Sequence, residues 1–200
     1  MFLVGIIIGS VLCIPIGPNG LVALSSTTSS GYKGVLGTAV GASIANLIVA
    51  IITTSLVFDF HQWEIDSGII RDLSCIFLMA FSLYFFTQKQ KQPSPQKPSS
   101  MSVAAYIQRA FTVGICNPKS LLGFPLVIFS TIPELNANIG LITSIKLGLG
   151  VFFSSVIWWC ILYWIFKAAD LASYPTIAET LSRLIAIAIF FIGIAGLALG

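Results

Sequence analysis

Residues 1–24 read MFLVGIIIGSVLCIPIGPNGLVAL, an uncharged apolar run that is interrupted once, by PIGPNG at residues 15–20. Two prolines and two glycines in six residues cannot continue a regular helix. Pro18 suits the first turn of a new helix, because the N–H that proline lacks would have no partner there. The sequence therefore predicts a helix that breaks near Gly17 and restarts at Pro18, with the first N–H groups of the new helix at its positive end.

The composition of the whole chain is that of a membrane protein. Of its 200 residues, 56% are hydrophobic and 8% are charged, whereas about 25% of the residues of a soluble domain are charged. A soluble fold of this length could not cover so much apolar surface with polar groups. We therefore expect an integral membrane protein whose surroundings are a lipid bilayer, and not a soluble enzyme, a nucleic-acid-binding protein or a disordered chain.

Six apolar runs are long enough, or nearly so, for spanning helices, which need about 20 residues. The runs cover residues 1–32, 35–58, 73–87, 110–132, 147–166 and 184–200. Between the third and fourth, Gln88–Ser102 reads QKQKQPSPQKPSSMS and cannot form a packed core. The predicted fold is an all-α integral membrane protein with six transmembrane helices, divided into a first three-helix repeat (1–87), a cytoplasmic linker (88–104) and a second three-helix repeat (105–200).

The distribution of Lys and Arg predicts the orientation of these helices. The second and fourth loops carry only Arg71 and Lys146. The first, third and fifth loops carry the other basic residues outside the spans: Lys33, Lys89, Lys91, Lys97, Arg109, Lys167 and Arg183. Because basic loops stay in the cytoplasm, we expect a multi-pass inner-membrane protein with both termini outside. The two halves then run in opposite directions, as in transporters built from inverted repeats, and the first and fourth helices are the broken ones.

The fourth apolar run contains a second break, Cys116-Asn117-Pro118-Lys119. Asn117 is suited to cap the segment that follows through its side chain. Lys119 lies ten residues after Arg109, or roughly 15 Å along a helix axis, which is deep in the bilayer. A charged side chain there costs about 3 kcal/mol or more and is a functional candidate. No Asp or Glu lies inside a predicted span, so Lys119 must face an aqueous cavity, lose its proton or meet an anion from outside.

The two breaks occupy matching positions in the two halves. Three pairs of identical residues share an offset of 103 positions: Cys13 with Cys116, Pro15 with Pro118, and Gly20 with Gly123. Proline kinks in membrane helices are often only structural. Two kinks at matched positions, one of them beside a buried Lys, favour a functional role, because paired interrupted helices mark the central site of a transporter.

These motifs resemble those of one transporter family. The residues that carry the resemblance are Gly17-Pro18-Asn19, the series Gly31, Gly34, Gly37 and Gly41, and Asn117-Pro118-Lys119. Together with the chain length, the six spans and the polar central loop, they resemble the LysE/RhtB family of amino-acid exporters. Members typically have Pro-Gly-Pro in the first helix, where this chain has Ile16-Gly17-Pro18. The resemblance implies that amino acids or related small solutes are exported at the expense of the proton gradient, without a cofactor.

The helix breaks fit the carboxylate of such a solute, because helix N-termini bind anions. We expect the N–H groups of Asn19 and Gly20 to bind the carboxylate and Lys119 to supply positive charge. We expect Asn46, in the middle of the second span, and Asn117 to contact the amine. The predicted substrate-binding residues are Gly17, Pro18, Asn19, Gly20, Asn46, Asn117, Pro118 and Lys119.

Two other functions remain open from the sequence. Cys13 and Cys116 each precede a break proline by two residues, so they could form a redox pair in a transmembrane thiol relay resembling the CcdA/DsbD electron conduits. The third possibility is ion or metal efflux, as in relatives within the LysE superfamily. The lack of membrane carboxylates counts against a divalent cation, and we expect no metal site.

Two G-x-x-x-G pairs, Gly5/Gly9 and Gly37/Gly41, predict close approach of helices. We expect these contacts within one chain. The alternative is an interface of a homo-oligomer.

Overall fold

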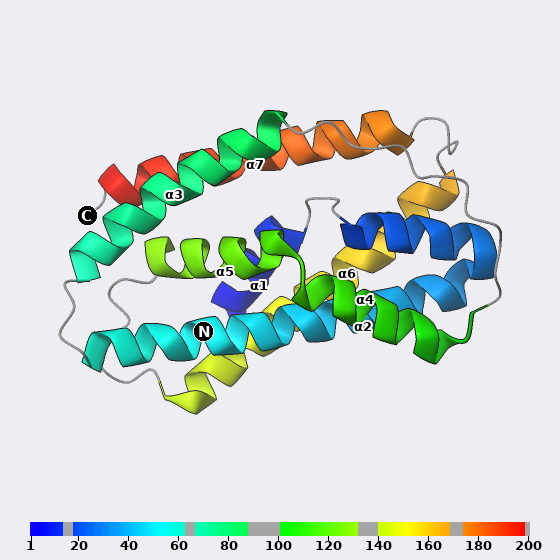
Figure 1. Cartoon of the computed structure of the whole chain (residues 1–200), viewed down its shortest axis with the longest axis horizontal. Helices are drawn as coiled ribbons and strands as arrows, with labels where there is room; N and C mark the ends of the chain where they lie inside the picture. Colours follow the sequence, from blue (N-terminus) through cyan, green and yellow to red (C-terminus); the bar gives the residue numbers. More distant parts are fainter. Residues whose placement is uncertain (14–17, 63–66, 88–100, 132–139, 169–173, 199–200) are drawn as a thin grey trace.

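The computed structural model describes residues 1–13, 18–62, 67–87, 101–131, 140–168 and 174–198, and within these ranges it contains seven helices and no strand (Figure 1). The helices are α1 (Phe2–Cys13), α2 (Pro18–Gln62), α3 (Ser67–Thr87), α4 (Val103–Ile115), α5 (Pro118–Thr131), α6 (Leu141–Ala168) and α7 (Tyr174–Ala198).

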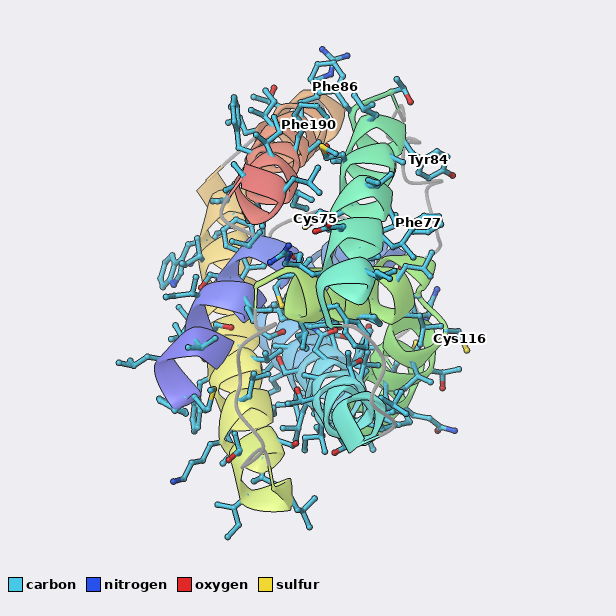
Figure 2. All side chains as sticks on the ribbon, turned by 90° about the vertical axis from the view of Figure 1, so that its left-hand side faces the viewer. Cys75, Phe77, Tyr84, Phe86, Cys116 and Phe190 are labelled. Carbon is cyan, nitrogen blue, oxygen red and sulfur yellow. The ribbon has the colours of Figure 1, made fainter. Side chains whose placement is uncertain are left out.

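The outer surface of the helices carries large apolar side chains. Phe77 and Tyr84 of α3, for example, are 61% and 56% exposed and project away from the neighbouring helices (Figure 2). Ser30–Leu56 and Leu141–Ile165 are each long and apolar enough to cross a membrane, and α4 and α5 qualify together as a pair bent by 57°. The predicted all-helical membrane architecture is thus confirmed, whereas the count of six spans stays a prediction.

The first helix break has the predicted restart. α1 ends at Cys13 and α2 begins at Pro18, where the ring fixes a helical φ and no N–H needs a partner. The predicted break at Gly17 falls in residues 14–17, which lie outside the described residues.

Helix α2 contains a sharp turn that the sequence did not distinguish from the rest of its glycine series. Gly31 has φ 58° and ψ −140°, in the left-handed half of the backbone map. Glycine adopts a positive φ without a steric penalty because it has no Cβ. Figure 1 shows the dark blue and the cyan leg of α2 meeting at this turn. The first predicted apolar run therefore ends where the chain turns back.

Four helix pairs hold the bundle together: α1 with α6, α2 with α4, α2 with α6, and α3 with α7. The α2–α6 pair is antiparallel, since Asn46 contacts Ser155 in the middle, and Ser55 contacts Ser144 towards one end. The α3–α7 pair is also antiparallel and lies along one side of the molecule (Figure 1). There Ser82 Oγ donates a hydrogen bond of 2.8 Å to the carbonyl oxygen of residue 186.

The two remaining pairs are parallel and depend on glycine. A Cβ on Gly5 or Gly9 would overlap α6, and a Cβ on Gly37 or Gly41 would overlap α4. Both G-x-x-x-G pairs thus pack within the chain, as we expected. Around them, apolar side chains of six helices form the core: Ile8, Val49, Ala50, Leu78, Phe124, Val127, Ile128, Leu147, Val151 and Ile189.

Candidate functional site

Asn46 lies in the middle of α2 and joins four helices through its amide. The side chain is only 7% exposed. Its Nδ2 donates to Cys13 Sγ of α1 at 3.4 Å and to Ser155 Oγ of α6 at 3.2 Å. Its Oδ1 accepts a bond of 3.3 Å from Ser120 Oγ of α5. We call these four residues the Asn46 cluster.

The Asn46 cluster connects the two helix breaks. Cys13 is the last residue of α1, directly before the first break. Ser120 lies in the first turn of α5, directly after the second break. Because both side chains bond to Asn46, the interrupted ends of two helices that are distant in the sequence meet at one buried amide.

The second break is built by backbone hydrogen bonds around Asn117. The N–H of Asn117 donates to the carbonyl oxygen of Gly114 at 3.2 Å and closes α4. The carbonyl oxygen of Asn117 accepts from the N–H groups of Ser120 and Leu121, each at 3.0 Å, and opens α5. Asn117 is therefore the N-cap of α5, with Pro118 at the first helical position, where proline is favoured.

The structure places the predicted site residues unequally. Asn46 and Asn117 are buried at the centre and at the second break, respectively. Gly17 lies outside the described residues. For the remaining predicted residues only the helical backbone is described, at the starts of α2 and α5: Pro18, Asn19, Gly20, Pro118 and Lys119.

Two members of the cluster, Ser120 and Ser155, were missed by the sequence reasoning. Ser120 directly follows Asn117-Pro118-Lys119, so its place in the break motif was a usable signal. Ser155 belongs to a Ser-Ser pair in the fifth apolar run, and polar residues inside a span tend to bond across helices. All described side chains of the cluster are uncharged, so they offer hydrogen bonds and no counter-ion.

The four cysteines are free thiols in different surroundings. Cys13 is buried against Asn46, whereas Cys116 is exposed and projects outward from the molecule (Figure 2). This geometry does not support a redox pair between them. Among the described residues, no group of three or more His, Cys, Asp or Glu side chains could hold a metal ion.

Comparison with known proteins agrees with the helical architecture. The family model described as LysE type translocator matches residues 10–199, nearly the whole chain. The searches of curated proteins and of solved structures return no match. The family match spans both helix breaks and the Asn46 cluster. The chain therefore belongs to the LysE type translocator family, a family of membrane transport proteins.

Proposed function

We propose that this protein exports amino acids or similar small zwitterionic solutes, driven by the proton gradient, through a site at the centre of the helix bundle. One observation carries the proposal: Asn46 bonds to Cys13 at the end of α1 and to Ser120 at the start of α5. Interrupted helices that meet near the middle of the membrane are where transporters of this construction bind their solutes. Membership of a translocator family supports the same function.

The carboxylate of the solute binds at the helix starts. α2 begins at Pro18 and α5 at Pro118, and the free N–H groups of a first turn attract an anion. In this proposal the N–H groups of Asn19 and Gly20 hold the carboxylate, and Lys119 supplies the positive charge. Lys119 is then neutralised by the solute itself, which explains how a charged side chain is tolerated inside a span.

The amine of the solute binds to the two buried amides, Asn46 and Asn117. An amide oxygen accepts two hydrogen bonds, and Asn46 Oδ1 accepts one from Ser120. One acceptor position therefore remains for an ammonium group. The solute would thus be held at opposite ends by a helix start and by an amide oxygen.

The helix contacts support two inverted three-helix repeats. α1 packs in parallel on α6, and α2 packs in parallel on α4. An ideal Cβ on Gly150 would lie 2.2 Å from the carbonyl oxygen of Phe2, and one on Gly41 would lie 2.2 Å from that of Ile107. A two-fold axis that exchanges the halves relates these two contacts, and the antiparallel pairs α2–α6 and α3–α7 would lie on that axis. Alternating access then follows from rocking the halves about the Asn46 cluster.

The basic residues support the proposed orientation. Tyr32 and Tyr163 are in ring contact at 5.3 Å, so the neighbouring Lys33 and Lys167 lie at the same end of the α2–α6 pair. Lys146 lies near its other end, close to the contact between residues 55 and 144. In our proposal the end with Lys33 and Lys167 faces the cytoplasm and both termini lie outside.

The test is release of amino acids from loaded cells. Cells that express the protein are fed dipeptides, and the amino acids that appear in the medium are measured against cells without it. We expect faster release, and its loss in Lys119→Met with the amount of inserted protein unchanged. Lys119→Arg, which keeps the charge, should retain part of the activity. Lys146→Met, which removes an exposed lysine of α6, is the matched control and should release at the parent rate.

Two results would contradict the proposal. Equal release with and without the protein, for every amino acid fed, would remove the export function. Parent-level release by Lys119→Met would leave export in place and exclude Lys119 from the mechanism.

A further inference from the structure

Three buried polar atoms near the Asn46 cluster have no hydrogen-bond partner among the residues that the structure describes. They are Ser43 Oγ of α2, and Nε1 of both Trp158 and Trp159 of α6. Ser43 is fully buried and Trp159 is 5% exposed. Buried polar groups are nearly always satisfied in native proteins, by protein, water or ligand. Three such atoms on two facing helices therefore point to something that binds there.

The pairing of α2 with α6 brings the three side chains to one level. The helices are antiparallel, and Asn46 bonds to Ser155. Ser43 lies three residues before Asn46, and Trp158 and Trp159 lie three and four residues after Ser155. At a rise of about 1.5 Å per residue, all three are displaced from the Asn46–Ser155 bond by about one turn in the same direction.

The neighbouring residues of α2 show which way Ser43 faces. Leu47 and Ile51 would contact a Cβ placed on Gly148 of α6, so both side chains lie on the face of α2 that meets α6. Ser43 precedes Leu47 by four residues, which puts it on the same face. The same spacing relates Trp159 to Ser155, whose hydroxyl bonds to α2. Ser43 and Trp159 therefore face one another's helices.

The chemistry of this group is one-sided. An indole N–H only donates, and a serine hydroxyl can donate as well. The segments Ser30–Leu56 and Leu141–Ile165 contain no Asp or Glu, so a cationic ligand group would find no counter-ion there. A carboxylate would exchange its hydration for neutral donors alone. An uncharged oxygen acceptor between aromatic rings fits best.

We propose that Ser43, Trp158 and Trp159 form the subsite for the solute's own side chain and that they select an uncharged side chain ending in a carbonyl oxygen, such as a carboxamide. We call these three residues the donor layer. The inference rests on the proposed function, because it takes the solute to be an amino acid held at the neighbouring Asn46. The donor layer lies between Asn46 and the end that carries Lys33 and Lys167.

The test compares three unbranched amino acids of similar length that differ in their terminal group. Cells are loaded through dipeptides with glutamine, methionine or lysine, and release per inserted protein is measured. We expect glutamine to leave fastest. Removing one donor, by Trp159→Phe or Ser43→Ala, should lower the ratio of glutamine to methionine release by about three- to tenfold, the value of one neutral hydrogen bond.

Two control variants remove the same groups elsewhere. Trp164→Phe removes an indole of α6 that is 64% exposed. Thr53→Val removes a buried hydroxyl of α2 that bonds to the carbonyl oxygen of its own helix, at Val49. Neither should change the glutamine-to-methionine ratio. The ratio is insensitive to partial misfolding, because a smaller active population lowers both rates equally.

The outcomes separate this inference from the proposed function. If the parent releases no amino acid faster than control cells, the export function fails and the donor layer loses its basis. If amino acids are exported but methionine or lysine leaves as fast as glutamine, the donor layer alone is overturned. An unchanged ratio in both Trp159→Phe and Ser43→Ala also overturns it and would indicate that the three atoms are satisfied by resident water.

Discussion

Alanine at Gly41 or at Gly150 should destabilise the protein to a similar extent. In both cases the new Cβ would lie 2.2 Å from a backbone carbonyl oxygen, that of Ile107 in α4 or that of Phe2 in α1. Contacts under 3.0 Å essentially never occur for a real Cβ, and a carbonyl within a helix cannot rotate aside. The facing helices must therefore separate by about 1 Å, in an interior that is close-packed.

The expected loss follows from the cost of overpacking, about 1–3 kcal/mol for each variant. Helix association in a bilayer depends on close van der Waals contact rather than on a hydrophobic driving force, so little compensates for the separation. A loss of this size changes the ratio of folded to unfolded protein by about 5- to 150-fold.

The measurement is reversible unfolding of the purified protein in mixed micelles, followed by the far-ultraviolet signal. Gly123→Ala is the control, because its Cβ would meet only the ends of the Leu12 and Phe81 side chains, at 3.3 and 3.7 Å, and we expect it to lose less than about 1 kcal/mol. Parent-like stability of Gly41→Ala and Gly150→Ala would refute the reasoning. A large loss in only one of them would contradict the two-fold relation between the halves.

Two further predictions concern the centre of the bundle. In a double-mutant cycle, Asn46→Ala and Ser155→Ala should show a coupling of about 0.6 kcal/mol and no more than about 1.7 kcal/mol, the range for hydrogen bonds between membrane helices; additive losses would mean that their 3.2 Å contact contributes nothing. In variants that retain a single cysteine, a thiol reagent should modify exposed Cys116 rapidly and buried Cys13 only after unfolding. Equal labelling rates would contradict the burial of Cys13, and loss of export in Cys116→Ser would revive the thiol relay.

The positions of the helix starts could be predicted from the sequence because they depend on local chemistry. A proline has no N–H and a fixed φ, so Pro18 and Pro118 mark first turns whatever surrounds them. The partners of Asn46 could not be predicted in this way. They depend on how α1, α5 and α6 are rotated about their own axes, and apolar residues on all sides of a membrane helix leave that rotation unmarked. Ser155 was therefore indistinguishable from its neighbour Ser154.

The turn at Gly31 shows the same limit from the other side. The glycine series across the second span indicated close packing, and Gly37 and Gly41 do face α4. Gly31 belongs to the same series but serves backbone conformation instead of packing. Only the torsion angles separate the two uses of one residue type.

Gly31 has a consequence for how the two legs of α2 are joined. Nothing lies within 4 Å of the position that a Cβ would occupy there, so a side chain would fit by volume. An L-amino acid is nevertheless disfavoured at φ 58°, where its Cβ crowds the backbone by about 1–2 kcal/mol. A D-alanine introduced by semisynthesis would meet no such penalty. At this hinge between two membrane segments, the chain discriminates by the handedness of a residue and is indifferent to its size.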